Sequence, residues 1–187
     1  MRKLVFQQFL SLDGYAADKE HSTKFFDSTD WGKESDQDML AEMQRFDTIL
    51  LGANTYRMFV EFWPDADPKE QIVADTLNSI PKVVFSETLD NAPWGKWEPA
   101  RIVKSDAAGE IRKLKDGPGK DLVLWGSISL ARNLIKAGVI DEYQLRLVPL
   151  VLGEGTLQFE GMPQLNMNLK DSKKYNSGLV FCRYTVK

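Results

Sequence analysis

The chain has 187 residues, of which 43% are hydrophobic and 27% are charged, and its formal net charge is -3. This length and composition fit one folded domain over residues 1–187 with a substantial core. The slightly negative charge argues against nucleic acid as a partner. No apolar run approaches the roughly 20 residues of a membrane span, so we expect no membrane partner. The strand ends described below favour a small-molecule substrate as the partner.

The amino-terminal run MRKLVFQQFLSLDGY predicts a first strand at residues 3–9. Gln7 and Gln8 interrupt its apolar stretch, which favours a strand over a signal peptide. The single cysteine, Cys182, excludes an internal disulfide, and the single histidine, His21, lies in a polar loop where we expect it to be solvated. No Cys/His metal set can form from these two residues. We therefore expect a cytoplasmic protein without a bound metal ion.

The central part of the chain alternates predicted strands with predicted helices. Four more strand-like runs follow the first, at residues 48–51, 82–85, 101–103 and 122–125. The helices between and after them are expected to start at Ser35, near Thr55, at Asp67, at Ser105 and after Ser127, and the last is expected to stop at Gly138. This alternation predicts βαβ units and a largely parallel sheet, typical of an α/β protein.

The last third of the chain has a different pattern. Apolar and polar residues alternate at residues 143–147 and again at 165–170, and Asn-Ser-Gly at 176–178 then leads into LVFCRYTV. The segments on either side of that turn predict an antiparallel hairpin, so the sheet is expected to be mixed. We also expect Tyr143, Arg146 and the run LVPLVLG to lie along an exposed edge and to pair with a second copy in a homodimer.

Small polar residues follow four of the predicted strands: SLDG, GANTY, SET and GSIS. In a parallel sheet these strand ends meet at one edge, where ligands bind. Gly126 and Ser127 stand where a strand enters a helix, an arrangement that lets backbone N–H groups approach a phosphate. The same residues also fit a plain corner, with Ser127 and Thr55 as helix N-caps. Neither a dinucleotide fingerprint nor a P-loop is present.

Four segments in order resemble the dihydrofolate reductase-like superfamily: SLDGYAAD, ILLGANTY, PKVVFSETL and LVLWGSISLARNLIKAGVIDEYQLRLVPLVLGEG. The resemblance is strongest to the C-terminal reductase domain of the bacterial bifunctional riboflavin biosynthesis deaminase/reductase and its stand-alone relatives. It implies a three-layer αβα fold and reduction of a pyrimidine- or pterin-like substrate by NADPH, with NADH as the alternative. A bound nicotinamide is needed because no amino-acid side chain donates a hydride.

The resemblance also implies which residues meet the ligands. The implied cofactor-binding residues are Phe9, Leu12, Gly52, Ala53, Thr55, Ser86, Gly126, Ser127, Ile128, Ser129, Leu130 and Ala131. The implied substrate-binding residues are Asp13, Thr23, Phe25, Met43 and Trp125. Asp36 and Asp38 lie in the region where dihydrofolate reductase has its proton-relaying carboxylate, but the spacing assigns the proton donor to neither.

Three positions depart from the family pattern. Ala53 stands where many relatives carry arginine, and Glu87 stands where a basic residue often follows the serine. Both changes remove positive charge expected near the 2′-phosphate of NADPH, and an acid at the ribose is typical of NAD sites. Trp125 stands where the riboflavin-pathway enzymes carry a substrate-binding glutamate. Two other functions therefore stay open: dihydrofolate reduction, and ligand binding without catalysis.

Overall fold

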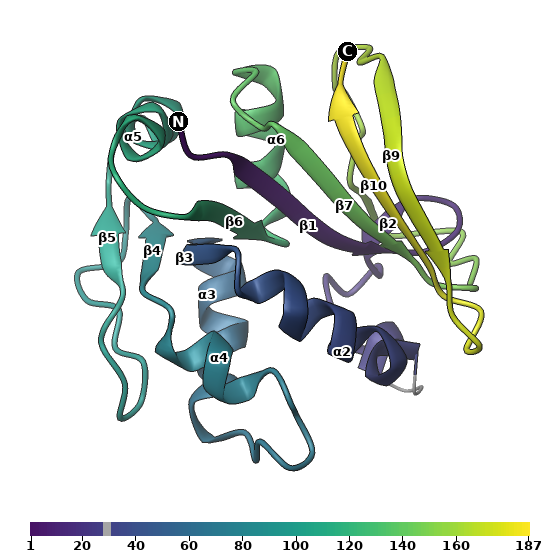
Figure 1. Ribbon diagram of the computed structural model, residues 1–187, viewed down its shortest axis with the longest axis horizontal. Helices are drawn as coiled ribbons and strands as arrows, with labels where there is room; N and C mark the ends of the chain where they lie inside the picture. Colours follow the sequence, from purple (N-terminus) through teal and green to yellow (C-terminus); the bar gives the residue numbers. More distant parts are fainter. Residues whose placement is uncertain (28–30) are drawn as a thin grey trace.

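The computed structural model describes residues 1–27 and 31–187, and these described residues form one eight-stranded sheet and one two-stranded sheet. The large sheet has the order β5-β4-β3-β6-β1-β7-β10-β9 (Figure 1). Its strands are β1 (Leu4–Leu10), β3 (Phe46–Gly52), β4 (Lys82–Phe85), β5 (Arg101–Val103), β6 (Asp121–Trp125), β7 (Glu142–Leu147), β9 (Met167–Lys174) and β10 (Val180–Val186). The small sheet pairs β2 (Tyr15–Ala17) with β8 (Thr156–Leu157). All five strands predicted in the first part of the chain are confirmed, with ends that differ by at most two residues.

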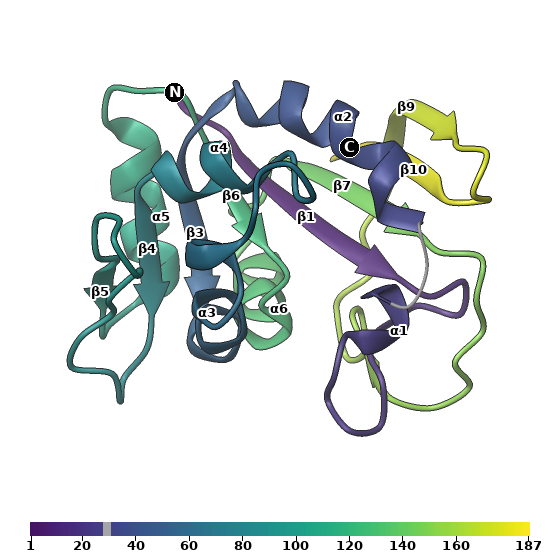
Figure 2. The ribbon, with the colours of Figure 1, turned by 90° about the horizontal axis from the view of Figure 1, so that it is seen from below.

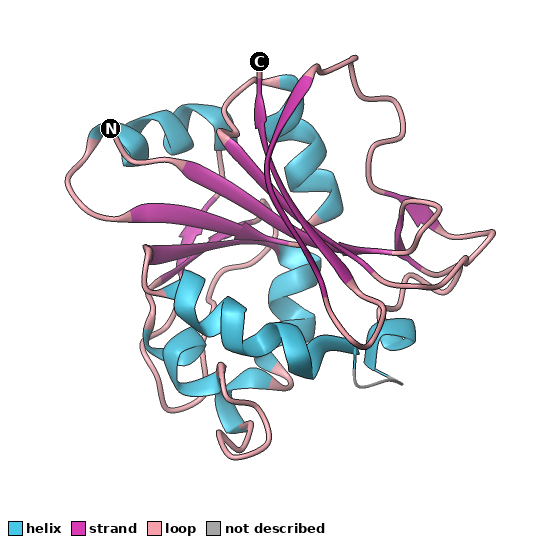
Figure 3. Ribbon diagram, turned by 45° about the vertical axis from the view of Figure 1, so that its right-hand side comes forward, coloured by secondary structure: helices cyan, strands magenta, loops and turns pink. Residues whose placement is uncertain are grey.

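Helices cover both faces of the large sheet, which gives three layers (Figure 3). The core on one face packs against α5 (Ala107–Asp116) and α6 (Ile128–Lys136). The opposite face is covered by α2 (Trp31–Met43), α3 (Ala53–Val60) and α4 (Ala74–Ser79). Two short helices, α1 (Lys24–Asp27) and the 3-10 turn η1 (Trp63–Asp65), complete the described elements. Leu4, Val5 and Phe6 are fully buried because β1 lies between both layers.

The parallel part of the sheet and its antiparallel end are both as predicted. Strands β1, β3, β4, β5 and β6 pair in parallel, and β7 is parallel to β1. Strand β10 then pairs antiparallel with both β7 and β9. The predicted turn holds: the N–H of Gly178, at φ 88°, donates to the carbonyl of Tyr175 at 3.1 Å. The mixed three-layer α/β fold is therefore confirmed.

Several predicted helix starts are wrong. Ser35 lies inside α2, four residues after its start at Trp31. Asp67 caps only an isolated turn, since its carboxylate accepts from the N–H of Lys69 at 2.9 Å and α4 begins later, at Ala74. Asp106 rather than Ser105 precedes α5. In contrast, Gly138 ends α6 as predicted, with the left-handed φ of 63° that favours glycine there.

Two of the residues expected to pair with a second copy, Tyr143 and Arg146, lie inside the sheet. Strand β7 has β1 on one side and β10 on the other, so Tyr143 and Arg146 are 2% and 1% exposed. The true edge strand of this half is β9, and its exposed lysines and Asp171 disfavour pairing with another strand. The prediction is thus wrong for Tyr143 and Arg146, which lie on a strand that is paired on both sides and covered on both faces. The run LVPLVLG, in which Val151 is 63% exposed, stays a predicted contact. The homodimer itself stays a prediction, which sedimentation analysis checks.

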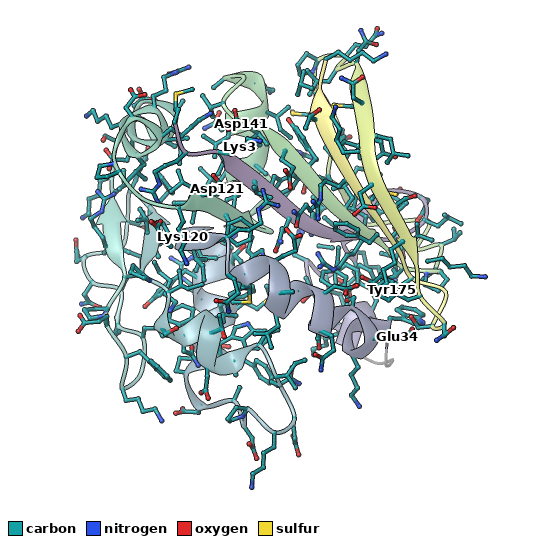
Figure 4. The ribbon with its side chains drawn as sticks, in the orientation of Figure 1. Lys3, Glu34, Lys120, Asp121, Asp141 and Tyr175 are labelled. Carbon is teal, nitrogen blue, oxygen red and sulfur yellow. The ribbon has the colours of Figure 1, made fainter. Side chains whose placement is uncertain are left out.

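The C-terminal hairpin is held against α2. Glu34 on α2 accepts hydrogen bonds from the side chain of Asn176 at 2.5 Å and from the N–H of Ser177 at 3.1 Å. Asp38, one turn further on, accepts from Tyr175 Oη at 2.6 Å and from Lys173 Nζ at 2.5 Å. Figure 4 shows Glu34 and Tyr175 together at this end of α2. These contacts fix the helix that covers the middle of the sheet.

No helix among the described residues is long and apolar enough to cross a membrane.

Candidate functional site

The two ends of the parallel strands differ in character. At the amino ends, Asp121 accepts from the N–H of Lys3 at 2.8 Å and Asp141 accepts from the N–H of Leu4 at 2.7 Å (Figure 4). At the carboxyl ends lies an open cleft of about 1220 Å³. Figure 2 shows β1, β3, β4 and β6 pointing to this side of the molecule, with α3 and α6 beside them. The ligand site is therefore expected at the carboxyl edge.

The corner between β6 and α6 has a special backbone. Gly126 and Ser127 both have left-handed φ values, 53° and 62°. Ser127 Oγ accepts a hydrogen bond from the N–H of Gly52 at 2.8 Å and donates to the carbonyl of Trp125 at 2.9 Å. The N–H of Ser127 donates to Thr55 Oγ1 at 3.1 Å. The two hydroxyls tie the end of β3 to the end of β6. Ser127 stands at the N-cap position of α6 as predicted, but the prediction that the Ser127 and Thr55 side chains bond the first turns of their helices is wrong.

Two helix N-termini are consequently left open at the cleft. Helix α3 follows Gly52 and helix α6 follows Ser127, and neither has a hydrogen bond from a capping side chain. The first N–H groups of a helix have no acceptor inside the helix, and they carry its positive dipole end. Ala53, Ile128 and Ser129, from these first turns, line the cleft. Backbone of this kind can bind an oxyanion such as a diphosphate.

Replacing Thr55 with valine is expected to lower the free energy of unfolding by about 1–3 kcal/mol. The methyl group cannot accept the hydrogen bond of the Ser127 N–H, which is then buried without a partner. Chemical denaturation measures the change. The exposed Thr88→Val serves as the control and is expected to stay within about 0.5 kcal/mol of wild type. Equal midpoints for the two variants would contradict the tertiary role of Thr55.

Most of the implied cofactor-binding residues line this one cleft. They are Phe9, Gly52, Ala53, Thr55, Ser86, Gly126, Ser127, Ile128, Ser129 and Leu130. Leu12 and Ala131 lie outside its lining. Leu12 is 66% exposed and its N–H donates to the carbonyl of Leu150, while Ala131 is fully buried in the core face of α6. Residues from three of the four predicted strand ends, GANTY, SET and GSIS, line this cleft, whereas SLDG does not, and β1 reaches the cleft through Gln7, Gln8 and Phe9.

The implied substrate-binding residues divide differently. Thr23 and Trp125 line the cleft, whereas Asp13, Phe25 and Met43 do not. Met43 is 1% exposed in the core beneath α2, and Phe25 packs in the cluster around Tyr175. Phe26 lines the cleft in place of its neighbour. Thr23 Oγ1 approaches Met58 Sδ of α3 at 3.6 Å, so this loop lies across one side of the cleft.

Asp13 joins two loops instead of facing the cleft. Its carboxylate accepts from Ser11 Oγ at 2.6 Å and from the N–H groups of Leu152 and Gly153 at 3.1 and 2.8 Å. Desolvation opposes ionisation, but these hydrogen bonds prevail and hold the pKa of Asp13 below its ordinary value. The side chain therefore stabilises the turn after β1, a role that Gly14, at φ 88°, shares.

The two acids considered as proton donors have different surroundings. Burial raises the pKa of Asp36 above its ordinary value, against the opposing charge of Arg146. Hydrogen bonds from Lys173 and Tyr175 lower the pKa of Asp38 and occupy its carboxylate. Neither residue lines the cleft. Asp38 holds the hairpin, and the structure places neither carboxylate where a proton donor would meet a ligand in the cleft.

Trp125 presents an apolar wall to the cleft. Its indole N–H donates to Gln7 Oε1, and Gln7 Nε2 donates to Gln144 Oε1 at 2.6 Å. Gln144 Nε2 in turn donates to Glu142 Oε1 at 2.7 Å. This hydrogen-bonded chain runs across β6, β1 and β7 and uses the only polar group of the indole. The ring therefore cannot replace the hydrogen bonds of a carboxylate.

Sequence reasoning missed many other residues of the lining, among them His21, Phe26, Arg132 and Arg146. His21 is exposed, as predicted, but its Nδ1 lies 3.2 Å from Thr156 Oγ1 at the side of the cleft. Arg132 donates to the carbonyls of Leu157 and Gln158. Arg146 stood in the alternating strand pattern as a solvent-facing residue. The available signal was the presence of an arginine in a strand that follows the apolar strand β6 along the chain.

Comparisons with known proteins agree with this architecture. A family profile described as the RibD C-terminal domain matches residues 2–181. "Uncharacterized protein YyaP" of Bacillus subtilis (strain 168) is 30% identical over 186 residues, which cover 96% of this chain and 92% of YyaP. The crystal structure of a putative riboflavin biosynthesis protein from Shewanella sp. PV-4 is 27% identical, with a TM-score of 0.77 and coverage of 100% of this chain and 99% of that one.

A more distant structure places the fold. Dihydrofolate reductase from Enterococcus faecalis, complexed with NADP(H) and RAB-propyl, superimposes with a TM-score of 0.58 over 99% of this chain and 96% of its own. The two sequences are 13% identical, so this likeness concerns the fold alone. The expected dihydrofolate reductase-like fold is confirmed.

Proposed function

The chain belongs to the RibD C-terminal domain family, and from this premise we propose that it is a nicotinamide-dependent reductase of the riboflavin-pathway type. It transfers a hydride from NADPH to a small heterocyclic or carbonyl-type substrate. The observation that supports this most is the pair of uncapped helix N-termini, those of α3 and α6, at one cleft. The Enterococcus neighbour was solved with NADP(H), and the Shewanella neighbour carries a riboflavin-biosynthesis name.

The residues fit such a cofactor in size and in donor chemistry. The cleft volume of about 1220 Å³ exceeds the range of roughly 300–1,000 Å³ that is usual for one small ligand. It has room for a dinucleotide and a substrate together. Gly52, Ala53 and residues 127–129 would hold the diphosphate by backbone N–H groups, and Ser86 would lie toward the adenosine ribose. Bound NADPH supplies the hydride.

The protein's own groups at the β1 end orient the reactants. Phe9 and Trp125 form flat apolar walls, and Phe26 closes the cleft from α1. Among the described residues, the acids of the lining are Glu87 and Asp106, which follow β4 and precede α5 at the other end. Neither carboxylate lies at the reacting end, and we assign the proton that accompanies the hydride to water, which suffices for an imine or an aldehyde.

Cofactor choice depends on the charge at the adenosine end. Glu87 faces the cleft there, and Lys104 is paired with Asp90 at 2.7 Å. Ala53→Arg is expected to tighten NADPH binding about tenfold, through a charge-assisted bond to the 2′-phosphate, and to leave NADH binding unchanged. Ala53→Gln, which adds length without charge, should change neither. Calorimetric titration of both coenzymes measures this.

Three results would count against the proposal. If neither NADPH nor NADH binds at millimolar concentration, the protein is no nicotinamide reductase. If Ala53→Arg tightens both coenzymes equally, the 2′-phosphate lies elsewhere. If NADPH binds but is oxidised with no pyrimidine, pterin or carbonyl compound, the alternative of ligand binding without catalysis is favoured.

A further inference from the structure

Arg146 has an unusual environment for a charged residue. It is 1% exposed, yet it lines the cleft. Its guanidinium lies between two aromatic rings, 5.6 Å from the centre of Phe9 and 5.2 Å from that of Phe181. An arginine stays protonated in proteins, and a buried charge is costly unless it is paired. Burial accordingly lowers the pKa of Arg146 below its ordinary value.

The hydrogen-bonding capacity of this guanidinium is unused by the described part of the chain. No described residue forms a hydrogen bond or an ion pair with it, and its buried Nε atom has no partner. The carboxylates of Asp36, Asp38 and Glu42 act on it only at longer range, together with Tyr175. Asp38 is already bonded to Lys173 and Tyr175, and Glu42 to Arg183 at 2.6 Å. The donors of Arg146 therefore remain available.

Neighbouring arginines show the contrast. Arg132 lines the same cleft but binds two backbone carbonyls and lies 3.6 Å from Glu160. Arg183, on the adjacent strand β10, also lies over the Phe181 ring but is paired with Glu42. Both have acceptors in the protein. Arg146 has the cation, the rigid aromatic support and the open donors of a site for an anion.

We propose that Arg146 is the specificity-determining residue of the substrate site, where it binds an anionic oxygen group, a carboxylate or a phosphate, carried by the substrate. The planar guanidinium matches both groups by two parallel hydrogen bonds. Arg146 is in register with Phe9, which borders the reacting end of the cleft, so the bound anion lies beside the proposed hydride donor. This inference rests on the proposed function because it calls the bound anion a substrate group, but the carboxylate arm of its test needs no coenzyme.

The test compares acids with neutral partners of the same shape on the full chain. Calorimetry without coenzyme measures orotate against uracil for the carboxylate arm. A separate titration, with NADP⁺ present to occupy the diphosphate site, measures ribose 5-phosphate against ribose for the phosphate arm. At least one acid is expected to bind about tenfold or more tightly than its neutral partner. The arm that shows this preference identifies the source of the anion.

The variants assign that preference to one residue. Arg146→Met is expected to abolish the preference for the acid, and Arg146→Lys to retain part of it, since lysine keeps the charge but loses the fork. Arg112→Met removes the same charge from the exposed face of α5 and should leave the preference intact. If Arg146→Met does not fold, the ¹⁵Nε resonance of Arg146, assigned with Arg146→Lys, should shift with the acid and not with the neutral partner.

Other outcomes would overturn the inference. These are equal binding of acid and neutral partner, no binding of any acid, or a preference that survives in Arg146→Met. Loss of coenzyme binding with an intact Arg146-dependent preference for orotate would reject the proposed reductase and leave the anion site in place.

Discussion

Replacing Gly126 with valine is expected to weaken NADPH binding about a hundredfold, which corresponds to about 2.7 kcal/mol. Gly126 stands at the entrance to α6 with φ 53°, and an added Cβ would lie 3.7 Å from Gln8 Oε1 and from Thr55 Cγ2. A single methyl group therefore fits, but the branches of valine extend into the space that the diphosphate needs. The loss of charge-assisted bonds from the helix N–H groups accounts for the size of the effect. Calorimetric titration with NADPH measures it.

Two alanine variants separate the occupied space from backbone strain. Gly126→Ala carries the left-handed strain, about 1–2 kcal/mol of stability, without filling the cleft. Gly138→Ala carries the same strain at the far end of α6, at φ 63° with no atom within 4 Å of the added Cβ. We expect Gly138→Ala to bind NADPH like wild type and Gly126→Ala to be only mildly weakened. A Gly126→Val protein that folds and binds with wild-type affinity would place the diphosphate elsewhere.

The fold could be predicted because it depends on local patterns. Alternating strands and helices specified the parallel core, and period-two alternation around Asn-Ser-Gly specified the hairpin. The helix starts were harder to predict, because a serine or threonine hydroxyl can either cap a helix or form a hydrogen bond to a distant part of the chain. Ser127 and Thr55 look like N-caps locally, but they bond to groups 75 and 72 residues away. Sequence spacing alone cannot distinguish such a tertiary contact from a cap.

The sequence predicts at which edge of the sheet the cleft lies, but not which side chains line it. Gly52, Thr55 and Gly126 were identified from their places at strand ends, which parallel pairing brings together. Met43 shows the limit, since helical periodicity turns it inward but does not distinguish core from ligand site. Phe25 and Phe26 show a second limit of the prediction. These adjacent residues on the short helix α1 face different directions, and only Phe26 reaches the cleft. Arg146 was missed because its strand is buried on both faces, which follows only from the position of α2.

The free energy of unfolding is expected to rise by about 2 kcal/mol between pH 7 and pH 9, owing to one buried lysine. Lys82, at the start of β4, is 4% exposed. Its Nζ donates to the carbonyl of Asn78 at 2.5 Å and lies 4.6 Å from the centre of the Trp94 ring. Burial lowers its pKa to about 7, whereas a lysine in the unfolded chain has a pKa of about 10.4.

The sign follows from proton binding in the two states. Between about pH 7 and pH 10 the unfolded chain holds a proton on Lys82 that the folded protein has released, so raising the pH favours the folded state. As the pH falls toward 7, folding must either expel that proton or bury the charge. Tyrosine ionisation lies above the range from pH 7 to pH 9, because a tyrosine in the unfolded chain has a pKa of about 10 and burial raises the pKa of Tyr143 to about 12 in the folded protein. Denaturant titrations at pH 7, 8 and 9 measure the change.

Lys82→Met should flatten the pH profile, because it removes the titrating group while keeping a side chain of similar length. Lys113→Met, on the exposed face of α5, should leave the rise intact. A wild-type profile that is already flat would mean that Lys82 keeps its charge in the folded protein, held by the Asn78 carbonyl and the Trp94 ring. A slope that persists in Lys82→Met would assign the released proton to another group. Because Lys82 lies outside the cleft lining, neither result depends on the identity of the ligand.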